Sequence, residues 1–390
     1  MIARIIIPLV LAFILSDVYV DRHFLRHSVK YRKLKRIVWL MQSVFMLCYA
    51  VILASSKSFA PANVEYLNVF LMLLGVWAVP KFVFTVCSLL GWGHCVYHKT
   101  KTNWGNYFGV AAGLCIAAIT VYGSSVGFSE FKVRHVTFVS ADLPKAFDGY
   151  KIVQFSDTHV GTYGVSRLNQ LSAAVDSINA QHADAIVFTG DLQNMQPSEL
   201  EPCMGILKRL NARDGVFSVL GNHDYAYYLN VDKATMKRNC QEMVDAQRRM
   251  GWTLLRNENR IVRRGKDSIV VAGMEYEGKS VKVPSRGDIV KSLHGIRQNS
   301  SFVLMLQHDP TSWLTDIIPH SKAQLTLSGH THGGQLEIFG WSPAALLYNQ
   351  WGGIYYSGTR AINVSTGLGG FVPFRLGCPG EIVVVELKCK

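Results

Sequence analysis

Five short polar clusters in the C-terminal two thirds of the chain contain residue types that suit metal-ion chemistry. They combine carboxylates, imidazoles and one carboxamide, and none of them contains a cysteine. Carboxylate and imidazole ligands together favour Mn, Fe, Zn or Co, whereas structural zinc sites commonly include cysteine. The candidate side chains are Asp157, His159, Asp191, Asn222, His223, Asp224, His308, His330 and His332.

The spacing of these residues suits a site for two cations. One carboxylate can bridge two metal ions, and ions about 3.5–4 Å apart can clamp the attacking and leaving oxygens of a phosphoryl displacement. His330 and His332 alternate on an extended segment, so their side chains share one side, as a ligand pair requires. Each cluster alone is common in turns, but their joint occurrence favours a metal site.

Each cluster follows an apolar run with the length and composition of a buried strand. Helical spacing over 165–182 and 198–210 separates the first three strands, and strands alone follow at 354–356, 360–364 and 381–387. This order predicts an α/β (α+β) layered sandwich rather than one doubly wound sheet, with the site at the carboxyl ends of its strands. The strands that end in clusters are predicted at 150–156, 185–189, 216–220, 302–306 and 324–327.

The order of the clusters resembles that of the calcineurin-like metallophosphoesterase superfamily. Two longer motifs, 329–335 and a tail of 367–369 followed by 373–381, are similar to its membrane-associated bacterial phosphodiesterase branch. The resemblance covers 131–390 and implies a calcineurin-like phosphoesterase fold and a metal-dependent phosphohydrolase activity. The motifs that carry it are Asp157-x-His159, Gly190-Asp191, Gly221-Asn222-His223-Asp224, His308 and Gly329-His330-x-His332.

The resemblance also implies a role for each candidate residue. Two divalent metal ions are expected, with Mn²⁺ favoured and Zn²⁺, Fe or Co²⁺ as alternatives. Asp191 would bridge the ions, which would activate a water to attack phosphorus. His223 would protonate the leaving oxygen or stabilise charge on the phosphoryl group, and Asp224 would orient His223. The other ligands would be Asp157, His159 and His332 for the first ion, and Asn222, His308 and His330 for the second.

Two further features leave alternatives open. Asp309 follows His308 directly and can also cap a helix that begins after Pro310. The aromatic-rich segment 338–351 either fills the core under the second sheet or forms an exposed patch that suits a lipid tail.

The N-terminal third, 1–130, is predicted to be a transmembrane anchor with four helices. Its apolar runs, 2–20, 37–54, 64–90 and 108–128, approach or exceed the roughly 20 residues that span a bilayer. Asp17 lies near a helix end, and Lys81 is expected to snorkel. The whole chain is 49% hydrophobic and 17% charged, which excludes a disordered protein or a disulfide miniprotein.

The distribution of basic residues predicts the orientation of this anchor. The net charge is +13, and much of the excess lies in loops of the apolar third, so it indicates membrane topology rather than nucleic acid as the primary partner. Nine Lys and Arg residues in the first and third loops face four on the other side. This count predicts a multi-pass protein of the inner (cytoplasmic) membrane whose domain 131–390 lies outside the cytoplasm.

The main functional prediction is a membrane-anchored phosphoesterase that acts on a lipid- or envelope-linked phosphomonoester or phosphodiester. Its predicted partners are the lipid bilayer and this phosphoester substrate. A first alternative resembles the UDP-2,3-diacylglucosamine pyrophosphatases of lipid A synthesis, which act at the cytoplasmic face. A second alternative is a non-catalytic membrane scaffold that a metal stabilises. The presence of His223 and Asp224 argues against this scaffold.

Overall fold

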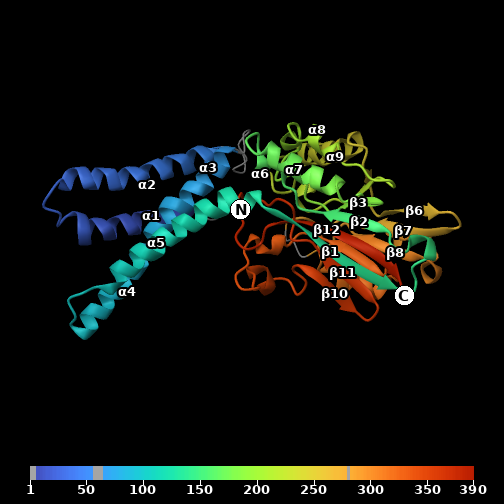
Figure 1. Ribbon diagram of the computed structural model, residues 1–390. Helices are drawn as coiled ribbons and strands as arrows, with labels where there is room; N and C mark the ends of the chain where they lie inside the picture. Colours follow the sequence, from blue (N-terminus) through green and yellow to red (C-terminus); the bar gives the residue numbers. More distant parts are fainter. Residues whose placement is uncertain (1–5, 56–64, 279–281) are drawn as a thin grey trace. The chain divides into compact units, whose positions relative to one another are not determined.

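The computed structural model describes residues 6–55, 65–278 and 282–390 (Figure 1). The chain divides into two compact units, Met1–Ser125 and Val126–Lys390. The domain boundary expected from the sequence, after residue 130, lies close to this division.

The N-terminal unit consists of apolar helices. Three helical segments in the described part of the chain are long and apolar enough to cross a membrane: Arg32–Ala54, Glu65–His98 and Trp104–Gly127. The expected runs 2–20 and 64–90 both begin in residues that the structure does not describe. The helices are α1 (Ile6–Val20), α2 (Arg32–Ser55), α3 (Glu65–Leu73), α4 (Val79–His98) and α5 (Trp104–Tyr122), with π-helical turns η2 (Asp21–Leu25), η4 (Leu74–Ala78) and η5 (Gly123–Gly127).

Helices α4 and α5 pack closely because α5 presents glycine at every fourth position. A Cβ added at Gly105 would lie 2.1 Å from the carbonyl oxygen of Cys87, and one at Gly109 would lie 3.1 Å from the Cα of Phe84. Small residues at this spacing let membrane helices approach each other, since packing rather than the hydrophobic effect drives their association.

Asp17 and Lys81 form an ion pair inside the N-terminal unit. The Lys81 side chain is only 5% exposed, and its Nζ also donates a hydrogen bond to Ser43 Oγ at 2.9 Å. It lies 4.3 Å from the centre of the Trp39 ring as well. The expectation that Lys81 snorkels toward water is therefore wrong, because a carboxylate from α1 accepts its charge within the helices.

We expect Lys81→Met to lower the stability of the full chain by about 3–5 kcal/mol, because it leaves Asp17 buried and unpaired. Thermal unfolding in detergent micelles measures the change. The double variant Asp17→Leu/Lys81→Met removes both charges and should recover most of the loss. Equal unfolding temperatures for the single and double variants would show that the unpaired Asp17 carboxylate does not cause the loss.

The C-terminal unit contains two six-stranded sheets. The first has the order β1-β12-β2-β3-β4-β5 and the second β10-β11-β9-β8-β7-β6. Strands β2 to β5 run parallel, as do β7, β8, β9 and β11. The strands are β1 (Phe131–Ser140), β2 (Lys151–Phe155), β3 (Ala185–Phe188), β4 (Val216–Ser218), β5 (Thr253–Leu254), β6 (Glu258–Arg264), β7 (Asp267–Gly273), β8 (Phe302–Leu306), β9 (Leu325–Ser328), β10 (Gly353–Ser357), β11 (Arg360–Val364) and β12 (Gly380–Cys389).

Helices and helical turns cover the sheets. In Figure 1, α7, α8 and α9 lie together beside strands β2 and β3. The helices are α6 (Val160–Tyr163), α7 (Leu168–Asn179), α8 (Met204–Leu207), α9 (Lys233–Arg249), α10 (Ile289–Ser292) and α11 (Ile318–His320). The turns are η6 (Lys145–Phe147), η7 (Pro197–Leu200), η8 (His223–Tyr225), η9 (Gln298–Ser300), η10 (Trp313–Ile317), η11 (His332–Gln335) and η12 (Pro343–Leu346).

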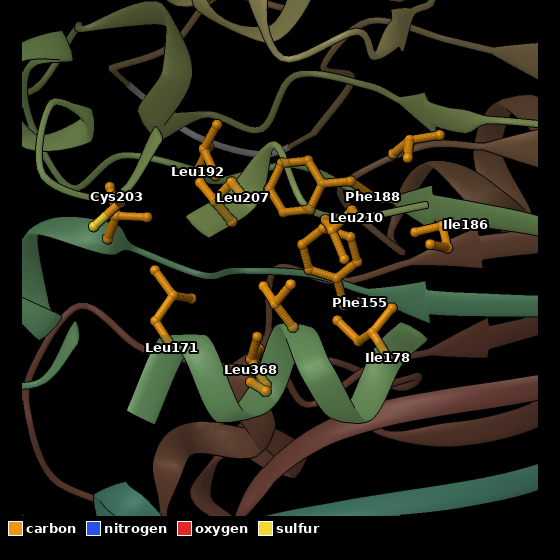
Figure 2. Packing of buried hydrophobic residues seen from close by; sticks show 14 of the residues in the cluster. Phe155, Leu171, Ile178, Ile186, Phe188, Leu192, Cys203, Leu207, Leu210 and Leu368 are labelled. Atoms are coloured by element: carbon orange, nitrogen blue, oxygen red, sulfur yellow. The ribbon is translucent and has the colours of Figure 1, made fainter. Parts of the chain in front are cut away.

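Alternate side chains of each strand enter different cores. Ile152 of β2 belongs to the buried cluster that the two sheets share, whereas its neighbour Val153 belongs to the cluster beneath the helices. Figure 2 shows Leu171 and Ile178 of α7 pointing into that cluster, which also contains Phe155 of β2. Because both faces of the central strands are buried, these strands read as continuous apolar runs in the sequence.

This arrangement agrees with the predicted layered sandwich, with one local error. The helix expected over 198–210 is wrong, because the segment forms only the turn η7 and the one-turn helix α8. Pro197 and Pro202 limit a continuous helix there. The other expected helix is shorter than predicted and spans Leu168–Asn179 as α7.

Candidate metal centre

All nine candidate residues lie in loops that directly follow parallel strands. The loops after β2, β3 and β4 come from the first sheet, and those after β8 and β9 come from the second. Since the carboxyl ends of parallel strands meet at one edge of a sheet, both sheets contribute their loops to one site.

The backbone of these loops is strained at the candidate ligands. Asp157, His159, Asp191, His330 and His332 all have φ between 46° and 75°. Residues with a side chain rarely adopt this left-handed conformation, and such residues cluster at functional sites.

Two glycines in the motifs allow the loops to approach each other. A Cβ at Gly221 would lie 2.1 Å from Asp191 Oδ1, and a Cβ at Gly329 would lie 2.2 Å from Asp157 Oδ2. Any larger residue at either position would therefore displace a carboxylate of the site.

The structure brings the candidate ligands together in two groups. One contains Asp157, His159, Asp191 and His332, and the other contains Asp191, His308 and His330; in each group the potential ligand atoms lie within 4.8 Å of one another. Asp191 belongs to both groups. Asn222 adds its carboxamide to the second group, where its Oδ1 lies 3.0 Å from His308 Nε2.

Backbone carbonyls orient two of the imidazoles toward the shared carboxylate. His159 Nδ1 lies 3.1 Å from the Gln193 carbonyl oxygen, and His308 Nδ1 lies 2.7 Å from that of Thr189. Each ring therefore directs Nε2 toward Asp191 Oδ2, at 3.6 Å for His159 and 3.3 Å for His308. A carbonyl partner on one nitrogen fixes the tautomer and leaves the other nitrogen free to bind metal.

Buried atoms without a hydrogen-bond partner show that these residues fit cations. Among the described residues, His159 Nε2 and His332 Nδ1 are both buried and have no such partner. Burial lowers the pKa of His159 to about 3 and that of His332 well below its ordinary value, so both rings are neutral, as metal ligands must be. Burial would raise the pKa of Asp191, but its neighbours His308 and His223 hold it well below the ordinary range.

His223 lies beside the metal-ligand groups and makes different contacts. Its Nδ1 lies 2.5 Å from the Asn194 carbonyl oxygen, and its ring stacks on Tyr228 at 4.2 Å. Its backbone N–H donates to Asp191 Oδ1 at 2.8 Å. Because the Asn194 carbonyl can only accept, Nδ1 carries the proton and Nε2 is left for a substrate.

The Asp224 carboxylate contacts backbone N–H groups rather than the His223 ring, so the expected direct orientation of that ring by Asp224 is wrong. Its carboxylate accepts backbone hydrogen bonds from Asp191 and Leu192 at 2.9 Å, from Gln193 at 3.3 Å and from Gly221 at 2.9 Å. Asp224 therefore joins the loops after β3 and β4 and acts as a positioning residue.

Family models match most of the chain. Residues 3–130 match "Probable Calcineurin-like phosphoesterase, transmembrane domain", and residues 150–334 match "Calcineurin-like phosphoesterase". An uncharacterized metallophosphoesterase of Bacillus subtilis, YkuE, is 30% identical over 72% of this chain and 95% of its own length. The chain belongs to the calcineurin-like phosphoesterase family.

The chain is also similar to a vertebrate relative and to a solved structure. A transmembrane protein with a metallophosphoesterase domain from Danio rerio is 31% identical over 72% of this chain, which spans 62% of that protein. A solved dimetal phosphatase from Danio rerio is 13% identical, with a TM-score of 0.32, over 58% of this chain and 89% of its own. The predicted family, the N-terminal transmembrane region and the mixed α/β fold of this phosphoesterase are confirmed.

Several residues that support the site were not predicted from the sequence. Asp309 accepts hydrogen bonds from Thr311, as a capping residue would, but its Oδ2 also lies 3.4 Å from His330 Nε2. The Tyr348 hydroxyl lies 3.1 Å from the same nitrogen. His330 Nδ1 therefore points toward His308, whose Nε2 lies 3.1 Å away. Asp309 and Tyr348 hold the other ring nitrogen of His330, Nε2. A carboxylate next to a candidate ligand histidine was the signal that could have identified Asp309.

We expect Asp309→Asn to weaken divalent metal binding by about 10–100-fold, because the carboxylate that orients His330 is lost. Titration of the metal-free full chain with Mn²⁺ measures the affinity. Asp316→Asn, which replaces another aspartate of the segment after β8, is the matched control. Equal affinities for the Asp309 variant and the control would contradict the orienting role.

Arg375 positions the loop behind Asp157. It is buried and donates to the carbonyl oxygens of Thr366 at 2.9 Å, Gly367 at 3.0 Å and Cys378 at 2.8 Å. A Cβ at Gly367 would lie 2.8 Å from that of Asp157. The guanidinium therefore holds the segment 366–378 in close contact with the first ligand group.

Proposed function

We propose that this family member is a membrane-anchored hydrolase of phosphomonoesters or phosphodiesters that uses two divalent cations, with Mn²⁺ favoured. The observation that supports two cations is the position of Asp191 in both ligand groups. In this proposal, Asp157, His159, Asp191 and His332 hold the first ion, and Asp191, Asn222, His308 and His330 hold the second.

The cations, when bound, would supply Lewis acid stabilisation of the phosphoryl oxygens and lower the pKa of the attacking water. The protein residues bind and orient the reacting groups. His223 keeps its Nδ1 proton on the Asn194 carbonyl, and in the imidazolium form, with a second proton on Nε2, it can donate that second proton to the leaving oxygen. Asp224 fixes the backbone of both Asp191 and His223, since it joins their two loops.

We propose further that the substrate is lipid- or envelope-linked and that the catalytic unit lies outside the cytoplasm. The excess of Lys and Arg in the first and third loops supports this orientation. A reporter that is active on only one side of the membrane, fused after Lys390, tests it. A cytoplasmic signal would overturn the orientation and favour the UDP-2,3-diacylglucosamine-type pyrophosphatase.

Hydrolysis of bis-(p-nitrophenyl) phosphate by the full chain tests the enzymatic proposal. The purified protein is stripped of metal with a chelator and then supplied with Mn²⁺ in detergent. We expect release of p-nitrophenol only after metal is restored. Folded, metal-loaded protein without turnover on a panel of phosphomonoesters and phosphodiesters would contradict the proposal and favour a metal-stabilised scaffold.

A further inference from the structure

The segment 338–347 exposes an unusual amount of apolar surface beside the candidate metal centre. Phe339 is fully exposed, and Leu346 and Leu347 are 75% and 79% exposed. Ile338 and Trp341 are about half exposed. The sequence left open whether these residues fill the core or form an exposed patch. In the structure they form an exposed patch. Contiguous exposed apolar patches mark interaction sites.

The patch is held rigidly rather than loosely. Ile338 and Trp341 exchange backbone hydrogen bonds of 2.9 and 3.0 Å, which close a tight turn with Phe339 at its tip. Phe339 has φ of 51°, a strained value for a large side chain. Ser342 Oγ donates to the Gly333 carbonyl oxygen at 2.6 Å, so the patch is tied to the residue that follows His332.

The chemistry of the patch suits the interface of a lipid bilayer. From residue 338 to residue 359 the sequence contains no Lys, Arg, Asp or Glu. Aromatic and aliphatic side chains at the tip are typical of segments that insert at the boundary between headgroups and acyl chains. Without charges, this insertion would depend on buried apolar area and not on anionic lipids.

The chain connects this patch closely to the point where it leaves the membrane. The last candidate span ends at Gly127, and Phe128 already belongs to the buried core of the catalytic unit. Phe131 of β1 pairs with Gly380, and Leu376 in the same C-terminal segment pairs with Leu336. Three contacting segments therefore join the end of the span to the start of the patch at residue 338.

A pocket links the patch to the ligand residues. It has a volume of about 390 Å³ and is lined by Tyr228, Leu347, Tyr348 and His330, among others. Leu347 thus belongs to both the exposed patch and the pocket, and His330 belongs to both the pocket and the second ligand group.

We propose that the segment 338–347 inserts into the bilayer interface and that the pocket admits the headgroup of a phosphoester lipid from that bilayer. The second part rests on the proposed phosphoesterase function, whereas the insertion does not. The class of substrate is a lipid whose phosphoester lies near the membrane surface, with Leu347 and Tyr348 in contact with its apolar part.

Quenching of a probe at residue 339 tests the insertion. Phe339→Cys in the full chain is labelled with a fluorophore and reconstituted into phosphatidylcholine vesicles with or without lipids that carry a shallow spin label. Val290→Cys, an exposed apolar position on α10, is the matched control, and labelled wild type gives the background from native cysteines. We expect at least about twofold stronger quenching at 339 than at 290, unchanged by 0.5 M salt. Equal quenching would overturn the insertion.

Substrate measurements test the second part separately. Phosphatidic acid and phosphatidylglycerol in the vesicles serve as monoester and diester probes, and bis-(p-nitrophenyl) phosphate serves as the soluble one. We expect Phe339→Ser to lower the ratio of lipid to soluble turnover by about tenfold, and Val290→Ser to leave it unchanged. Turnover of the soluble ester alone by wild type would overturn the lipid substrate but not the phosphoesterase function. No turnover of any ester would contradict the function and leave the quenching result standing.

A second copy of the chain is the other possible occupant of the patch, and the oligomeric state tests for it. If Phe339→Ser converts a dimer in detergent into a monomer while residue 339 is not quenched, the patch is an interface between two copies of the chain and the proposal is wrong.

Discussion

Asp191→Asn should reduce phosphoester hydrolysis by at least about 1,000-fold and remove metal from both ligand groups. The carboxylate is the one group that both sets of candidate ligands share. A neutral carboxamide of the same size cannot bridge two cations, and cations of this kind contribute several kcal/mol to stabilising the transition state. Metal content of the purified variant and its rate with bis-(p-nitrophenyl) phosphate measure the two effects.

A matched change elsewhere separates this effect from a general loss of structure. Glu201→Gln removes an exposed carboxylate of the same unit and should retain both metal and activity. If the Asp191 variant were to bind two equivalents of metal with unchanged affinity, the bridging role would be wrong, whatever happened to the rate.

His223→Ala should retain both metal ions and lose about 10²–10⁴ in rate. His223 is outside the two ligand groups, and its Nδ1 is engaged by the Asn194 carbonyl. Loss of a positioned general acid costs a factor of this size. The test is metal content together with kcat on substrates whose leaving groups differ in pKa, because good leaving groups need less protonation and should suffer less.

The exposed His182 supplies the control for this experiment, since His182→Ala should change neither quantity. A rate loss that is the same for good and poor leaving groups would argue against proton donation by His223. Loss of one metal ion in His223→Ala would show that it acts as a ligand.

The sequence predicted the strands that carry the site because these strands are buried on both faces and end in polar clusters. It did not predict β1 or the β6–β7 hairpin. β1 lies at the edge of its sheet, and Lys132, Arg134 and His135 interrupt its apolar residues, so it does not form an apolar run. β6 is likewise an edge strand with four charged residues among seven. Edge strands carry charges that discourage pairing with further strands. Because of these charges, a search for apolar runs does not detect them.

Within the site, residue types could be predicted from the sequence, but contacts between loops could not. Asp224 was expected to act on His223, its neighbour in the chain, whereas it accepts hydrogen bonds from the loop after β3. The support for His223 comes from a carbonyl at Asn194, and a backbone carbonyl leaves no signature in residue type. The pair of Asp17 and Lys81 was missed for a related reason, since they come from different helices.

The position of β12 has a consequence for how the protein is made. β12 ends at Cys389, yet it lies between β1 and β2 and is the only strand that pairs with β1 among the described residues. While the ribosome synthesises the chain, β1 therefore emerges some 250 residues before its partner and must wait unpaired. The first sheet can be completed only after residues 380–389 have been synthesised, so a truncation before residue 380 that spares every candidate metal ligand would leave β1 without its strand partner among the described residues.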